Sequence, residues 1–273
     1  MNLYDKIFPP KKIVLSDGKE ILEPRSRMPL VIILFVIAAW ISIDVTGFDL
    51  SVVIKRGKYF FDILKQMVPP EWGYLDHIWT PLFDTIKMSL LGSVIGSLVA
   101  IPFAILAASN IIGSKIVISI MRLFLSLVRT MPTLVIALIA TYIFGLGTLA
   151  GTTAIAVFTF AYIGKLLYEQ IETVDMGAYE AMESFGATKL KAFLAAIVPQ
   201  VLPSYIANCL FCFEGNVRYA SILGYVGAGG LGLILNEKIG WREYSSVGMI
   251  LLALFVAVMV IEGISYYLRK KLT

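Results

Sequence analysis

The sequence predicts an all-α membrane protein that crosses the bilayer about six times. Of its 273 residues, 58% are apolar and only 15% are charged, and the mean hydropathy is +0.83. Soluble domains average roughly 45–50% apolar and about 25% charged residues. The apolar residues form long unbroken runs, which favour helices over a closed β-barrel, because barrel strands would show short alternating segments.

Six apolar runs approach or exceed the ~20 residues that a helix needs to cross a hydrocarbon core. They are Leu30–Gly47, Thr85–Ser109, Ile116–Phe144, Leu149–Tyr168, Leu202–Leu223 and Val247–Leu268. The third run is long for one straight crossing and carries Pro132, where a helix should kink. Segment 51–68 mixes basic and aromatic residues, which is typical of a helix lying in the membrane interface.

The runs divide the chain into an N-terminal tail (1–28), a first transmembrane helix (29–47), an external segment (48–80) and a five-helix core (81–268). If the first helix crosses outward, the cytoplasmic segments hold twelve Lys and Arg and the outer segments six. This asymmetry predicts that both termini are cytoplasmic, together with a loop at 173–200 inside the core. A cleaved signal peptide is the alternative for the first run, although no small-x-small cleavage site follows it.

The polar stretch at residues 172–203 contains the pattern of a short amphipathic helix. A helix over about 177–185 would carry one apolar stripe with an acidic flank. The stripe consists of Tyr179, Met182 and Phe185, and the flank consists of Glu180 and Glu183. Gly186 follows as a helix-terminating glycine. Such a helix suits docking into a groove of a partner protein, and a solvated loop helix resting on the membrane is the alternative.

The segment GYVGAGGLG (224–232) has the glycine spacing of a dinucleotide-binding fingerprint, but it follows a membrane helix and not a strand. Glycines allow positive φ and close backbone approach, so this loop can dip back between helices. Non-helical backbone at membrane depth is tolerated only where protein buries it or where it lines a water-filled cavity. The sequence therefore predicts a gate loop formed by Gly227, Gly229, Gly230 and Gly232.

Ionisable residues inside the apolar runs indicate a polar pathway or internal ion pairs. A charge near the bilayer centre costs at least ~2.5–3.5 kcal/mol unless it is paired or hydrated. Glu214 and Arg218 are four residues apart, so they can pair on one helical face. Exposure of Arg218 to an anionic substrate is the other explanation. The candidate pathway residues are Arg129, Pro132, Glu214, Asn216 and Arg218.

Three stretches carry a resemblance to a known family. EAMESFGATKLKAFLAAIVP resembles the EAA loop of ABC importer permeases, with Glu180, Ala181, Gly186 and Pro199 in register and Met182, Ala196 and Val198 as small or apolar replacements. RTMPTLVIALI (129–139) and the glycine loop resemble the methionine-type permease fold. The permease subunit of phosphonate importers is similar in two further segments, MVPPEW and FEGNVRYASILGYVGAGGLG (213–232). The resemblance covers about residues 67–268.

The resemblance implies a type I ABC importer permease in the bacterial inner membrane. It implies that the EAA loop, including Tyr179 and Glu183, is a coupling helix that docks on a cytosolic ATPase, with Glu180 meeting a basic residue there. The implied partners are a second copy of the chain, two ATPase subunits that bind ATP and Mg, an external solute-binding protein and the lipid bilayer, without nucleic acid. The implied solute is a phosphonate or a related phosphorus oxyanion, with methionine or another small solute as the alternative.

Two other classes of function are disfavoured. A secondary transporter would show inverted repeats, and an intramembrane enzyme would need a catalytic set, neither of which is evident. Cys209 and Cys212 form a CxxC inside an apolar run, where two buried thiols explain it better than a redox pair. His77 is the only histidine, and the zinc-binding motif HExxH does not occur. The phosphate-binding motif Gly-x-x-x-x-Gly-Lys-Ser/Thr does not occur either. We therefore expect no metal and no cofactor in this chain.

Overall fold

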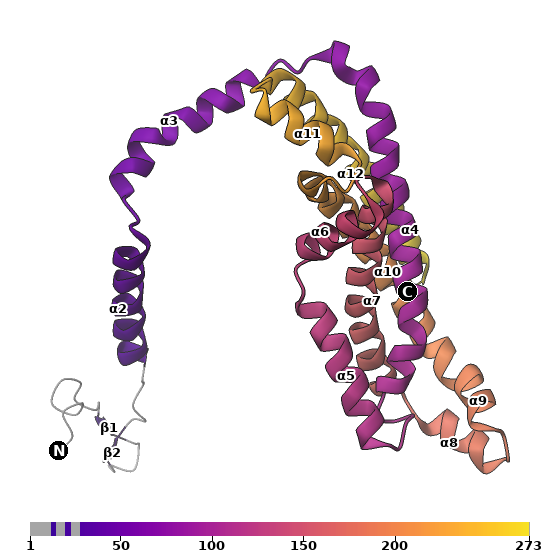
Figure 1. Cartoon of the computed structure of the whole chain (residues 1–273). Helices are drawn as coiled ribbons and strands as arrows, with labels where there is room; N and C mark the ends of the chain where they lie inside the picture. Colours follow the sequence, from indigo (N-terminus) through magenta and orange to yellow (C-terminus); the bar gives the residue numbers. More distant parts are fainter. Residues whose placement is uncertain (1–11, 15–19, 23–27, 273) are drawn as a thin grey trace. The chain divides into compact units, whose positions relative to one another are not determined.

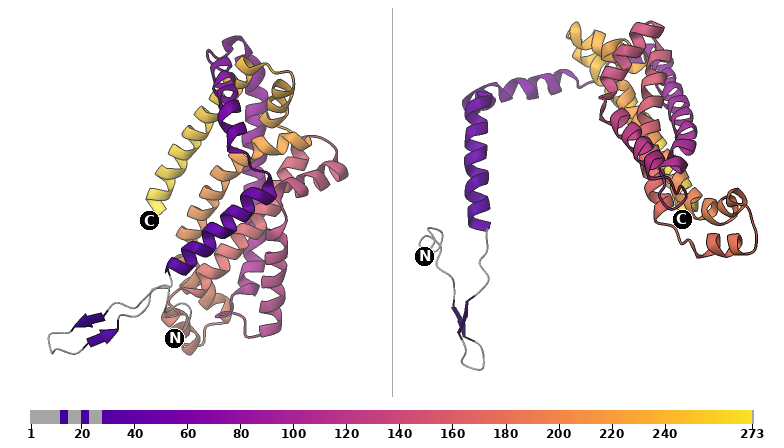
Figure 2. Two further views of the ribbon diagram at one scale, coloured as in Figure 1. Left: turned by 90° about the vertical axis from the view of Figure 1, so that its left-hand side faces the viewer. Right: turned by 60° about the horizontal axis from the view of Figure 1, so that its bottom comes forward.

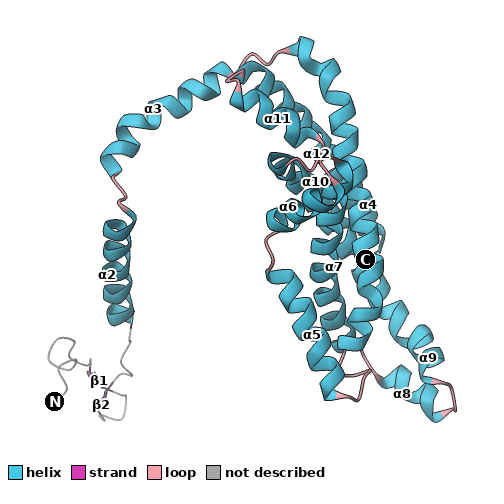
Figure 3. Cartoon of the chain, in the orientation of Figure 1, coloured by secondary structure: helices cyan, strands magenta, loops and turns pink. Residues whose placement is uncertain are grey.

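The computed structural model describes residues 12–14, 20–22 and 28–272, and nearly all of these residues are helical (Figures 1 and 3). The chain divides into two compact units, residues 1–62 and 63–273. The functional residues predicted from the sequence all lie in the second unit.

The first unit contains two short strands and a long apolar helix. Strands β1 (Lys12–Val14) and β2 (Glu20–Leu22) pair antiparallel in a part of the tail for which no strand was predicted. Helix α2 (Met28–Thr46) coincides with the predicted first transmembrane helix. Helix α3 (Leu50–Gln66) occupies the segment for which an interfacial helix was predicted.

The second unit is a helical bundle. Its elements are η1 (Trp72–Tyr74), α4 (Leu75–Ala107), α5 (Lys115–Thr130), α6 (Thr133–Phe144), α7 (Thr148–Glu172), α8 (Gly177–Ser184), α9 (Lys189–Ala192), the π-helical turn η2 (Phe193–Ile197), α10 (Val198–Leu223), η3 (Gly224–Val226), α11 (Leu231–Gly240) and α12 (Tyr244–Leu272). Figure 1 shows α8 and α9 at one end of this bundle and α11 at the other. Helices α4, α7 and α10 contact one another. Figure 2 shows the bundle from two further sides.

The membrane spans agree with the apolar runs. Within the described ranges, five helical segments are long and apolar enough to cross a membrane, or six if α5 and α6 form one broken span. These two helices meet at an angle of 85°. Pro132 caps α6 because proline lacks the N–H that a continuous helix would use. The kink predicted at this position is therefore a complete break.

Helix α4 is longer than its apolar run indicates. It begins at Leu75, well before Thr85, where the run begins. Asp76, His77 and Asp84 lower the local hydropathy without interrupting the helical backbone.

The contact between α4 and α7 is made by small residues. A Cβ built on Gly96 of α4 would lie 2.4 Å from the Ala156 carbonyl oxygen of α7. Close backbone approach through small residues is the usual way in which membrane helices associate, since lipid offers no hydrophobic driving force. The serines of α4 satisfy their hydroxyls locally: Ser89 Oγ donates to the Thr85 carbonyl at 2.7 Å and Ser93 Oγ to the Ser89 carbonyl at 2.6 Å.

Candidate functional site

The loop helix predicted near residues 177–185 is α8, and it ends at Gly186. Gly186 has φ = +87°, in the left-handed region that glycine adopts without strain. Its N–H donates to the Glu183 carbonyl at 2.9 Å. The next N–H, that of Ala187, donates to the Met182 carbonyl at 3.0 Å. Together the two bonds form a Schellman motif, which confirms the prediction that Gly186 terminates the helix.

The apolar stripe of α8 is largely used inside the bundle. Tyr179 is 6% exposed and Met182 is half-buried, and both pack in a core cluster with Ile171 and Ile197. Burial raises the pKa of the Tyr179 phenol above its ordinary value. The third member of the stripe, Phe185, is 92% exposed. The buried part of the stripe therefore anchors α8. The exposed residues on the outer side of this segment are Glu180, Ala181, Ser184 and Phe185.

Polar contacts tie three helices together directly before α8. Glu172, the last residue of α7, accepts a hydrogen bond from the Ser109 backbone N–H at 2.7 Å and pairs with Arg122 of α5. The Arg122 Nε donates to the Ala107 carbonyl at 3.0 Å, and its guanidinium lies 4.9 Å from the centre of the Tyr168 ring. Arg122 was not singled out from the sequence, although an arginine inside an apolar run is a signal that it needs a partner.

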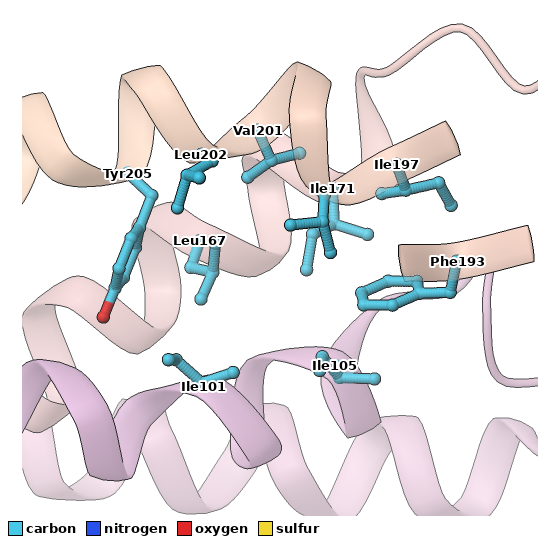
Figure 4. Close-up of a pocket in the computed structure, with 10 residues that line it drawn as sticks. Ile101, Ile105, Leu167, Ile171, Phe193, Ile197, Val201, Leu202 and Tyr205 are labelled. Atoms are coloured by element: carbon cyan, nitrogen blue, oxygen red, sulfur yellow. The ribbon is translucent and has the colours of Figure 1, made fainter. Parts of the chain in front are cut away.

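An apolar cavity of about 110 Å³ lies beside this end of the bundle, between α4, α7 and the start of α10 (Figure 4). Ile101 and Ile105 of α4 face the other helices across it, and Phe193 of the π-helical turn lies at one end. Its one hydroxyl, that of Tyr205, donates to the Ser97 carbonyl at 2.9 Å. This lining offers no charge or free donor for an anion, so the cavity is unsuited to a charged solute.

The glycine loop is a buried turn between two helices. Gly227, Gly229 and Gly230 have φ values of +77°, +83° and +70°, and residues 228–232 are buried. A Cβ on Gly232 would lie 2.1 Å from the Ser221 carbonyl oxygen, so the backbones of α10 and α11 are in direct contact. Because helices stand on both sides of the loop, it is not the strand-to-helix turn of a dinucleotide site.

Hydrogen bonds hold the glycine loop against the bundle. The Gly147 N–H, between α6 and α7, donates to the Gly227 carbonyl at 2.9 Å. The Leu231 N–H donates to Thr85 Oγ1 of α4 at 2.8 Å. The loop therefore returns between helices that are distant in sequence, as the glycine pattern predicted.

Asn216 lies at the centre of the α4, α7 and α10 packing. Its side chain is 1% exposed, and Nδ2 donates to Ser93 Oγ at 2.8 Å and to Thr159 Oγ1 at 2.9 Å. One amide group thus connects α10 to two neighbouring helices. Such interhelical hydrogen bonds stabilise membrane bundles modestly, by about 0.6–2 kcal/mol each.

Glu214 is shared between two arginines. The residue is 4% exposed; Oε1 pairs with Arg218, and Oε2 lies 3.4 Å from Arg269 Nη2. The guanidinium of Arg269, near the end of α12, also lies 5.7 Å from the centre of the Phe211 ring. The pair proposed between Glu214 and Arg218 is present. The sequence analysis missed Arg269 because the two helices that carry the pair are far apart in the chain.

Arg218 opens onto a cavity of about 430 Å³ between α7 and α10. Its side chain is 53% exposed even though it pairs with Glu214. The other lining residues are Phe158, Tyr162, Phe211, Cys212, Gly215, Asn216, Tyr219 and Ile222. The half-exposed guanidinium of Arg218 offers hydrogen-bond donors to this cavity, which suits an anion.

Arg129 and Pro132 do not belong to this cavity. Arg129 is exposed in the last turn of α5, and Pro132 lies at the break before α6. Of the candidate pathway residues, the structure therefore groups Glu214, Asn216 and Arg218 and leaves the other two apart.

Comparison with known proteins decides the family. Residues 100–273 match the family of binding-protein-dependent transport system inner membrane components, a range that contains α8, the arginine cavity and the glycine loop. The chain belongs to this family. It is a multi-pass membrane protein with several helices apolar enough to cross a bilayer.

Individual relatives agree with this assignment. The phosphite transport system permease protein PtxC of Stutzerimonas stutzeri is 33% identical over 75% of this chain and 74% of its own length. The phosphate-import permease protein PhnE of Mycolicibacterium smegmatis is 35% identical over 77% of this chain, which spans only 40% of that longer relative.

A solved structure supports the fold of this chain. A chain of the inward-facing MetNI methionine ABC transporter superposes with a TM-score of 0.66 at 20% identity, covering 74% of this chain and 99% of its own. The chain therefore has the type I permease fold that the resemblance implied.

Proposed function

We propose that this chain forms the membrane pathway of an ATP-driven importer for a phosphonate or a related phosphorus oxyanion. The observation that carries the proposal is the half-exposed guanidinium of Arg218, which faces an aromatic cavity. Asn216, which lines the cavity, bonds to Ser93 in the apolar span of α4, so the cavity lies at the level of the membrane-spanning segments. An arginine at that depth is costly and therefore indicates a functional site.

The chemistry of the cavity fits an oxyanion that passes without being trapped. A guanidinium offers paired donors that match the geometry of phosphorus oxyanions. Glu214 offsets the charge of Arg218, so an anion is held weakly and can leave again. The relatives named for phosphite and phosphate transport support a phosphorus solute.

The same proposal assigns the motor contact to α8. We place both termini in the cytoplasm of a bacterium, where the outward face of α8, with Glu180 and Phe185, docks into a cleft on an ATPase subunit. Two copies of the chain and two ATPases form the transporter, and an external binding protein delivers the solute. Closure of the ATPases then moves the α8 helices together and rocks the bundles between inward-facing and outward-facing states.

Reconstitution tests the proposal. In proteoliposomes with the ATPase and the binding protein, ATP-dependent uptake of labelled methylphosphonate should fall about tenfold or more in Arg218→Gln, because a charged hydrogen-bond donor is lost. Lys115→Gln, at the exposed start of α5, is the charge-matched control. Uptake without the ATPase would indicate a secondary transporter, and uptake of methionine in place of phosphonate would overturn the choice of solute.

A further inference from the structure

The Glu214 carboxylate has a second arginine that the transport proposal does not use. Its two oxygens contact two different helices: Oε1 pairs with Arg218 of its own α10, and Oε2 lies 3.4 Å from Arg269 of α12. Of the two arginines, Arg218 lines the cavity and Arg269 does not. The side chain of Arg269 is 28% exposed, against 53% for Arg218.

We propose that Glu214 competes with the solute anion for Arg218, and that Arg269 sets how strongly it competes. The inference rests on the proposed transport function and concerns how the site releases its solute. A carboxylate and a phosphorus oxyanion both present oxygen acceptors to a guanidinium, so each can replace the other on Arg218.

Arg269 makes this exchange possible. If Glu214 had Arg218 as its sole partner, every solute contact would leave a buried carboxylate without a counter-charge, and that is strongly unfavourable. With Arg269 beside Oε2, the carboxylate keeps one partner while Arg218 turns toward the cavity. The separation of 3.4 Å is longer than a typical ion-pair hydrogen bond, so this contact can shorten as the other breaks.

The neighbouring residues favour a small movement of Arg218 alone. Arg269 is held by its cation–π contact with Phe211 and by a bond from Nε to the Ser265 carbonyl at 3.4 Å. Asn216, two residues from both Glu214 and Arg218 and so on the opposite side of the helix, fixes α10 through Ser93 and Thr159. The exposed guanidinium of Arg218 is therefore the part of the cluster that is free to exchange partners. Glu214 and Arg269 are positioning residues in this scheme.

The test separates affinity from turnover. Binding of labelled methylphosphonate is measured on the purified permease–ATPase complex without binding protein, and maximal uptake is measured in proteoliposomes with binding protein. Glu214→Gln keeps the shape of the side chain but removes its charge. We expect it to bind about tenfold more tightly and to transport more slowly, because Arg218 is no longer shared.

Substitution of Arg269 should change the affinity for methylphosphonate in the opposite direction. Arg269→Gln should weaken binding about tenfold, because Glu214 then holds Arg218 alone, and Arg269→Lys should recover part of the affinity. A purely structural role would lower the amount of folded complex and leave the affinity per complex unchanged. Unchanged or weakened binding in Glu214→Gln overturns the competition. If Arg218→Gln itself binds methylphosphonate normally, the cavity is not the solute site and the proposed function fails first.

Discussion

The glycine-rich centre of the bundle and the loop helix α8 are held in place by opposite means. In the centre, backbone contacts backbone: a Cβ on Gly96 or Gly232 would lie within 2.4 Å of a carbonyl oxygen. In α8, two side chains anchor the helix and one glycine ends it, while Glu180, Ala181, Ser184 and Phe185 are exposed. The difference indicates that steric fit constrains the centre, whereas the outer face of α8 is free to match a partner.

The largest expected effect comes from filling the α4–α7 contact. Gly96→Ala forces a methyl group against the Ala156 carbonyl, and overpacking of this kind costs roughly 1–3 kcal/mol or more. Gly263→Ala in α12 is the matched control, because nothing lies within 4 Å of a Cβ there and alanine favours the helix. Thermal unfolding of the purified protein in detergent should show a markedly lower melting temperature for Gly96→Ala and not for Gly263→Ala. Equal melting temperatures would mean that α4 and α7 are not in such close contact.

A smaller effect is expected at the end of α8. Gly186→Val places a β-branched residue at φ = +87°, which costs about 1–2 kcal/mol, yet a Cβ there meets no neighbour. The bundle should stay folded while the end of α8 loses its cap, so ATP hydrolysis should continue with less uptake per ATP. Gly186→Asn is the control, since asparagine tolerates this backbone region better. Normal coupling in the valine variant would contradict the docking role of α8.

Local patterns predicted the parts of the molecule that depend on local chemistry. Hydropathy located the spans, and the glycine after an amphipathic segment located the end of α8, because both are properties of neighbouring residues. A kink at Pro132 was expected for the same reason, although a complete break between two helices was not.

Long-range pairs could not be predicted in this way. Nothing near Glu214 in the sequence indicates Arg269, and nothing near Glu172 indicates Arg122, because each pair forms between helices brought together by packing. The apolar stripe of α8 shows the same limit: periodicity placed Tyr179 and Phe185 on one stripe, but tertiary contacts bury the first and leave the second exposed.

The smallest effect on stability is expected at Phe185. A substitution there should separate the folding of the bundle from the docking of α8. Its side chain is 92% exposed, so Phe185→Ser should change the free energy of unfolding by no more than about 0.5 kcal/mol. A large apolar side chain exposed at the end of an anchored helix is a favourable contact for a protein groove, so the same change should weaken binding of the ATPase. Leu190→Ser, at an exposed leucine of α9 beyond Gly186, is the control for a general loss of surface hydrophobicity. Co-purification of the ATPase with each variant measures the difference. If both variants retain it equally, Phe185 is not part of the contact, and the docking surface is confined to the acidic side of α8 around Glu180.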